Sequence, residues 1–139
     1  MKPPFHVAAS AAIGFLVYLY FKSASCAIIS FLAGVLMDVD HIFDFHLNHG
    51  IKKHRLFFRT MYAHDLKKLI LVFHSYELLI LLWLGIILFS LNKYWISFTI
   101  GFTQHMLFDR LTNPINFGGY FLLYRVYHKF DTEKIVKKS

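Results

Sequence analysis

Four apolar runs divide this sequence and constrain its fold more than any other feature. They cover Val7–Phe21, Ala24–Met37, Leu69–Leu91 and Tyr94–Phe108. As a helix the third run would extend about 34 Å, which is enough to cross a bilayer. Each of the others reaches only about 22 Å unless flanking residues join it. The pattern predicts an all-α integral membrane bundle of about four helices, with a cytoplasmic loop and a C-terminal tail.

The composition agrees with a membrane protein. Hydrophobic residues make up 57% of the chain and aromatic residues 19%, whereas a soluble domain is nearer half apolar. The single cysteine, Cys26, excludes a disulfide within the chain. We expect one membrane-embedded domain over residues 1–139, with a polar basic loop at 41–68 and a basic tail at 128–139.

The basic residues predict an orientation in the membrane. If all four runs cross, Lys22 and Lys93 are the only basic residues on the side away from the termini, out of 15 in the chain. By the positive-inside rule, we expect an inner (cytoplasmic) membrane protein with both termini in the cytoplasm. The expected partner is the lipid bilayer, and no nucleic acid is required, because the basic residues do not follow one helix face. A signal peptide is the alternative for the first run, but a second apolar run follows at once, which favours a helical hairpin.

Residues of the kinds that bind metal ions lie at the same predicted end of all four helices. The set consists of His6, Asp38, Asp40, His41, His74, Glu77, His105 and Asp109. Each of the last three helices contributes a pair spaced three or four residues apart, which would share a helix face. Ionisable groups in apolar helices are costly unless they pair or bind metal. Any one pair could be a simple hydrogen bond, but their convergence predicts a metal site.

The expected position of the carboxylates adds an electrostatic argument. Asp38, Asp40 and Asp109 would stand at helix C-termini, where the helix dipole disfavours negative charge. A bound divalent cation would reverse that cost. Imidazole with carboxylate suits zinc best, with manganese and iron as alternatives.

Three short motifs resemble a known family. They are "GVLMDVDH" at 34–41, "FHS" at 73–75 and "GFTQHMLFDRLTNP" at 101–114. With the early His6, they are similar to motifs of the predicted membrane-bound metal-dependent hydrolases (the YdjM-like family), although Phe73 stands where that family has threonine. The resemblance implies a metal-dependent hydrolase, and the family is itself distantly similar to zinc-dependent phospholipase C.

The resemblance and the residue pattern together suggest the ligands of the ion. We expect one metal ion to be bound by His74, His105, Asp109 and one or both of Asp38 and Asp40. His6 and His41 would complete this site or support a second ion.

Other residues would serve the reaction. Asp40, or else Glu77, is expected to act as general base. Arg55, Arg59 and Arg110 are expected to bind a phosphate group of the substrate. The predicted function is hydrolysis of a phosphoester, on a small molecule or a lipid, at the cytoplasmic face.

Two other functions remain open. A metal or proton carrier would also place ionisable groups in a membrane, but the stretch "LLILLWLGIILF" after Glu77 offers no polar relay. A non-catalytic membrane protein stabilised by its metal is the other alternative.

Overall fold

The computed structural model describes residues 3–49 and 68–136, and they fold into helices. The elements are α1 (Pro3–Phe21), α2 (Ala24–Leu36), α3 (Val39–His49), α5 (Tyr76–Phe89), α6 (Lys93–Thr112), the 3-10 helix η2 (Phe117–Tyr120), α7 (Leu122–Tyr127) and α8 (Thr132–Ile135). Within these residues there are two isolated β-bridges and no strand. The all-α prediction is therefore confirmed for this part of the chain.

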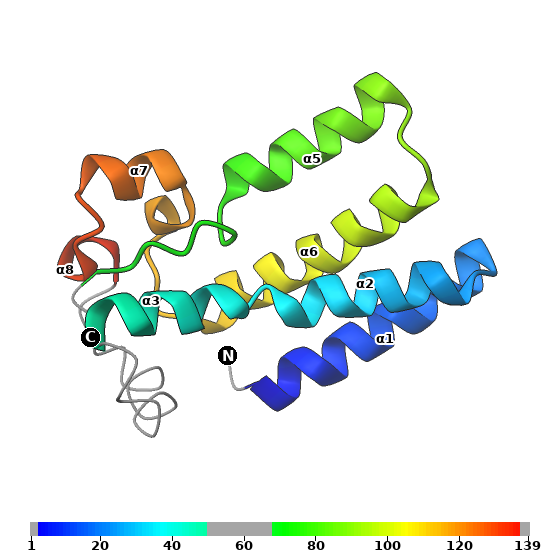
Figure 1. Cartoon of the computed structure of the whole chain (residues 1–139), viewed down its shortest axis with the longest axis horizontal. Coiled ribbons are helices and arrows are strands. Elements are labelled where there is room, and N and C mark those ends of the chain that lie inside the picture. Colours follow the sequence, from blue (N-terminus) through cyan, green and yellow to red (C-terminus); the bar gives the residue numbers. More distant parts are fainter. Residues whose placement is uncertain (1–2, 50–67, 137–139) are drawn as a thin grey trace. The chain divides into compact units, whose positions relative to one another are not determined.

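The chain divides into two compact units. Met1–Met37 and Glu77–Asn113 form the first unit, and Asp38–Tyr76 and Pro114–Ser139 form the second. The first unit contains α1, α2, α5 and α6, and the second contains α3, η2, α7 and α8 (Figure 1). The expectation of a single domain over residues 1–139 stays a prediction.

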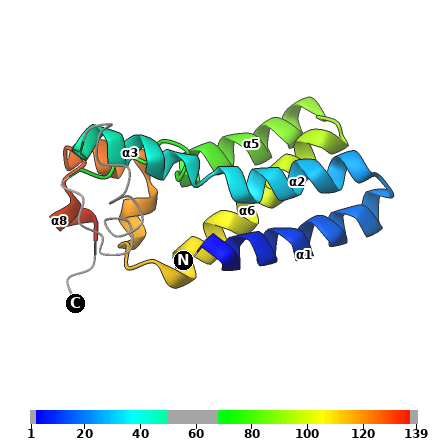
Figure 2. The same cartoon turned by 60° about the horizontal axis from the view of Figure 1, so that its bottom comes forward.

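Helices α1, α2 and α6 pack against one another in the first unit. Only Lys22 and Ser23 connect α1 to α2, so the two helices form a hairpin, and α6 lies alongside it (Figure 2). In α1, the Ser10 hydroxyl donates a 3.0 Å hydrogen bond to Gln104 of α6. The result is that the start of α1 and the end of α6 lie at the same end of this bundle.

Two glycines allow α2 and α6 to approach closely. A Cβ atom at Gly101 in α6 would collide with the carbonyl oxygen of Ser30 in α2, and one at Gly34 in α2 would collide with the side chains of Gln104 in α6 and Ser10 in α1. Small residues at such crossings are typical of helices packed in membranes, where close backbone approach drives association. The spacing of these contacts also shows that α2 and α6 run in parallel.

Two stretches are long and apolar enough to cross a membrane, by length and composition alone. They are Pro4–Phe21 and Ala24–Leu47, and the second continues past the end of α2 at Leu36. Helix α5 is apolar, but its 14 residues extend only about 21 Å. Two of the four expected crossings are therefore supported by this criterion among the described residues.

The third apolar run is not helical from its start. Helix α5 begins at Tyr76, and Leu69–Ser75 is irregular, with Leu71 in the left-handed region at φ 42°. The Asp44 carboxylate accepts hydrogen bonds from the backbone N–H groups of Ile70 (2.7 Å) and Leu71 (3.2 Å). Because these groups are satisfied by a distant side chain, the segment does not need a helix to bury its backbone.

The predicted basic loop and tail also contain regular structure. The stretch 41–68 was expected to be a loop, but α3 runs to His49. The expected tail, 128–139, contains α8, whose Ile135 is fully buried. Nearby, the ring of Tyr76 packs against the rings of Tyr120 and Phe121, with centroids 5.5 and 5.4 Å apart. These contacts give the second unit its own core.

Candidate metal centre

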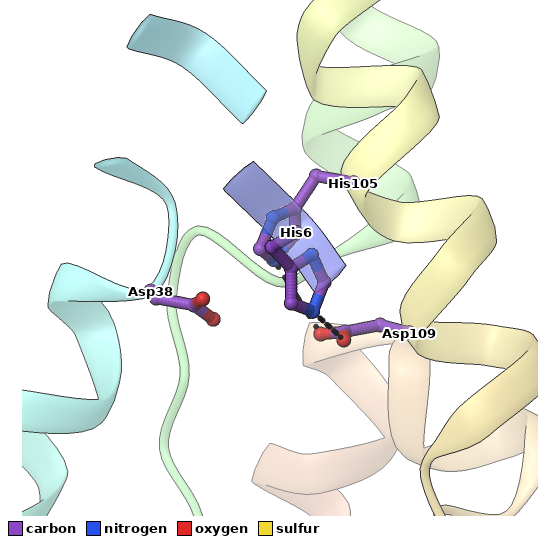
Figure 3. Close-up of side chains that lie close together, drawn as sticks. All are labelled: His6, Asp38, His105 and Asp109. Carbon is purple, nitrogen blue, oxygen red and sulfur yellow. Dashed lines mark ion pairs between the residues drawn. The ribbon is translucent and has the colours of Figure 1, made fainter. Parts of the chain in front are cut away.

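Two histidines and one aspartate meet at the end of the first unit. His6 comes from α1, and His105 and Asp109 come from successive turns of α6. The His6 Nε2 atom lies 3.1 Å from Asp109 Oδ1, and His105 Nε2 lies 3.5 Å from Asp109 Oδ2. All three side chains are at most 2% exposed. Figure 3 shows the two imidazole rings beside the Asp109 carboxylate, and this buried group could hold a metal ion.

The tautomer of the neutral His105 ring follows from its hydrogen bond to α2. Its Nδ1 lies 2.7 Å from the carbonyl oxygen of Gly34. A carbonyl can only accept, so Nδ1 carries the hydrogen. In the neutral ring, Nε2 then presents a lone pair to the Asp109 carboxylate, which is also an acceptor. Two buried acceptors facing each other need a cation between them, either a proton or a metal ion.

The distances in this group match those around a tetrahedral ion. Two ligand atoms that each lie about 2.1 Å from one zinc ion are about 3.4 Å apart. The nitrogen–oxygen distances of 3.1 and 3.5 Å fall on either side of that value. The longer one, at His105, is too long to be a good hydrogen bond.

His6 and His105 also stack on each other. Their ring centroids are 4.4 Å apart, and the ring planes differ by 24°. Two stacked imidazole rings in a buried site repel each other when both carry a positive charge, and burial adds to that cost. Neutral rings stack without this repulsion, and the neutral imidazole is the form that binds metals.

A second group of ligand-type residues lies in the second unit. Asp38 stands in the turn before α3, His41 in the first turn of α3, and His74 in the irregular segment before α5. The Asp38 Oδ1 atom lies 3.6 Å from His41 Nε2 and 3.8 Å from His74 Nε2. The rings of His41 and His74 are 5.0 Å apart. These side chains could also take part in metal binding.

Asp40 has a different environment from the one that the sequence predicts. It lies in the first turn of α3, not at a helix C-terminus, so the helix dipole favours its charge. Its Oδ2 atom accepts the backbone N–H of Phe73 and lies 3.3 Å from His74 Nδ1. For Asp40 the argument from an unfavourable dipole is therefore wrong, because α3 begins where the sequence predicts a helix end.

His74 and Glu77 do not share a helix face as predicted. His74 precedes α5, and Glu77 is half-buried in the first turn of that helix. Glu77 also belongs to neither group of ligand atoms found in the described part of the chain. The spacing of three residues does not bring the pair together, because the helix starts between them.

The expected phosphate-binding arginines can be placed only in part. Arg110 is half-buried in the last turn of α6, next to Asp109 in the sequence. Arg55 and Arg59 lie outside the described residues.

The sequence did not predict two buried residues that hold the segment carrying His74. Arg125, on α7, is fully buried and donates to the carbonyl oxygens of Leu71 (2.8 Å) and His74 (3.0 Å). Asp44, on α3, holds the same segment through its N–H groups. The spacing of Asp40 and Asp44, which are four residues apart, was a signal that both face the same side of a helix.

No family model, curated protein or solved structure matches this chain. The resemblance to membrane-bound metal-dependent hydrolases therefore stays a prediction from short motifs. The expectation that both groups of ligands serve one ion also stays a prediction.

Proposed function

We propose that this chain is a membrane-embedded, metal-dependent hydrolase that cleaves a phosphoester at the cytoplasmic face. The observation that carries the proposal is the pairing of His105 with Asp109. The histidine nitrogen that faces the carboxylate cannot donate to it in the neutral ring, because the hydrogen is on the nitrogen bound to Gly34. A divalent cation resolves this conflict between acceptors in a buried site.

The donor set favours zinc, with manganese or iron as alternatives. His6, His105 and Asp109 would bind an ion in the first unit, and Asp38, His41 and His74 would bind metal in the second. Such an ion lowers the pKa of a bound water and polarises a phosphoryl oxygen. The chain itself would supply Glu77 to accept a proton and Arg110 to hold a phosphate oxygen.

The polarity of α3 supports a membrane location. Its outward face carries Val39, Ile42, Phe43 and Leu47, each 45–59% exposed. Its inward face carries Asp40 and Asp44, which are buried and hydrogen-bonded to backbone. A helix on the surface of a soluble protein shows the opposite arrangement. Together with the two apolar stretches of sufficient length, this arrangement supports the proposal that the outward face of α3 meets lipid.

Metal analysis of the purified protein tests the metal-binding part of this proposal. We expect at least one equivalent of zinc per chain in detergent, and a loss of bound metal in His105→Ala and Asp109→Asn. Asp131→Asn is a matched control, because the Asp131 side chain caps α8 and asparagine caps a helix about as well. The same metal content in all of these proteins would contradict the proposal.

A substrate panel tests the hydrolase part. We expect the zinc-loaded protein to hydrolyse a phosphodiester or a phospholipid headgroup, and the Asp109→Asn protein to be inactive. Stoichiometric metal without hydrolysis of any phosphoester would rule out the proposed reaction. That result would favour the alternative of a metal-stabilised membrane protein. Metal or proton flux in proteoliposomes would instead favour a carrier.

A further inference from the structure

His74 reaches its cluster from an irregular segment, not from a helix. Side chains from elsewhere in the second unit hold that segment, Leu69–Ser75, in place. The N–H of Leu69 donates to the carbonyl oxygen of Phe130, and Asp44 accepts the next two N–H groups, at Ile70 and Leu71. The backbone that leads to His74 is therefore held by residues that lie far away in the sequence, and none of these contacts reaches the His74 ring.

Asp40 contacts both the ring of His74 and the backbone just before it. Its Oδ2 atom accepts the N–H of Phe73 and faces Nδ1 of the His74 ring at 3.3 Å. This contact places the hydrogen of the neutral ring on Nδ1 and leaves Nε2 with a lone pair. That lone pair faces Asp38 Oδ1 at 3.8 Å, which leaves space for an ion between them.

We propose that Asp40 is a positioning residue, which fixes the ring of His74 for metal binding and is neither a ligand nor the general base. This inference rests on the proposed metal site. Carboxylates that orient metal-bound histidines in this way are common, and their loss weakens metal binding without removing the site. The role differs from the one that the sequence predicts, because two donors contact Oδ2 of Asp40 and Asp40 belongs to neither group of ligand atoms found in the described residues.

Arg125 fixes the backbone of His74. Its two terminal nitrogens donate to the carbonyl oxygens of Leu71 and His74, and the side chain is fully buried. The planar fork of a guanidinium can reach both carbonyls at once, which the single ammonium group of lysine cannot do with the same geometry. Asp40 thus holds the ring of His74, and Arg125 holds its carbonyl group.

The three roles open to Asp40 predict different metal-binding behaviour. A ligand, when replaced by asparagine, reduces the amount of metal bound or changes its coordination. A general base leaves metal affinity unchanged and lowers only the rate. A positioning residue weakens affinity by about 10- to 100-fold while the same ligands still bind.

The test uses the full-length protein in detergent, loaded with zinc or with cobalt(II). Zinc affinity is measured by competition with a chelator, and the visible spectrum of cobalt(II) reports its coordination. For Asp40→Asn we expect about 10- to 100-fold weaker zinc binding with unchanged stoichiometry at saturation and the same type of cobalt spectrum. Asp38→Asn should instead change the spectrum or the stoichiometry.

Asp44→Asn is the matched control. Asp44 lies on the same helix and accepts hydrogen bonds from Ile70 and Leu71, which precede His74 by four and three residues. We expect it to lower thermal stability and to leave zinc affinity within a factor of about three. Equal losses of affinity in both variants would show a general structural effect and overturn the inference. An unchanged affinity in Asp40→Asn, or a loss of stoichiometry like that of Asp38→Asn, would also overturn it.

These outcomes separate this inference from the proposed function. If the wild-type protein binds no metal, the proposed function fails and the inference fails with it. If the wild-type protein binds metal and only the Asp40→Asn result differs from expectation, the inference alone fails. Arg125→Lys provides a second measurement, for which we expect weaker zinc binding with unchanged stoichiometry.

Discussion

His105 donates its Nδ1 hydrogen to the carbonyl oxygen of Gly34, 2.7 Å away, and so turns Nε2 toward Asp109. The packing of α2 against α6 therefore determines which nitrogen can bind a metal. Gly34 serves this contact twice, because its carbonyl accepts the hydrogen and its missing side chain leaves space for Ser10 and Gln104.

Gly34→Ala should weaken metal binding. The added methyl group would collide with the Ser10 hydroxyl and the Gln104 side chain, so α2 must shift away from α6 and from His105. Overpacking of this kind costs about 1–3 kcal/mol of stability. Chelator competition should show weaker zinc binding, and thermal unfolding should show the loss of stability.

Gly85→Ala is the control for this change. Gly85 lies in α5, and a Cβ atom there would make only an ordinary contact of 3.8 Å with Leu91. Alanine is favoured over glycine in a helix by about 1 kcal/mol. We expect unchanged zinc affinity and equal or higher stability, and a similar loss of affinity in both variants would contradict the role of Gly34.

The meeting of His6, His105 and Asp109 in the first unit was largely predictable from the sequence. His105 and Asp109 are four residues apart in an apolar helix, and a hairpin of two helices returns His6 to the same end. Helical periodicity and short connections are enough to bring these side chains together. The distances and the hydrogen bond to Gly34 were not predictable, because they depend on how closely α2 and α6 pack.

The surroundings of Asp38, His41 and His74 in the second unit were predicted less well, for two physical reasons. The apolar residues from Leu69 onward read as the start of a helix, but their backbone groups bind Asp44 and Arg125, which lie far away in the sequence. Tertiary hydrogen bonds thus override local preference. Helix α3 was missed because its charged residues face inward and its apolar residues outward, which is the reverse of the usual pattern.

Removal of metal should destabilise the protein. An ion that binds only the folded state stabilises it by about 2.7 kcal/mol when its free concentration is 100 times the dissociation constant. We expect a strong chelator to lower the unfolding temperature of the wild-type protein. His6→Ala, which removes one buried ligand from the first unit, should reduce this shift. An identical shift in His46→Ala and His6→Ala would point to an effect away from this group of ligands, since His46 hydrogen-bonds to the carbonyl oxygen of Ile42 within α3.

Glu77→Gln should separate proton transfer from metal binding. Glu77 lies in the first turn of α5 and outside both groups of ligand atoms. If it accepts a proton during hydrolysis, its loss should lower kcat by about 100- to 10,000-fold, with zinc affinity and stoichiometry unchanged. Turnover of a phosphodiester and metal content are measured on the same sample. A variant with full activity would exclude Glu77 as the base.

The outward face of α3 should be in contact with lipid. Phe43 and Leu47 are 59% and 56% exposed, whereas Phe45, on the same helix, is fully buried in protein. In a Cys26→Ala background, an environment-sensitive fluorophore on Phe43→Cys or Leu47→Cys should emit at shorter wavelength in liposomes than in mild denaturant, and lipid-borne quenchers should reduce its emission. The same fluorophore at Lys129→Cys, an exposed residue of the second unit, should respond far less to those quenchers. Equal quenching at all three positions, or none at Phe43 and Leu47, would show that this face does not meet the bilayer.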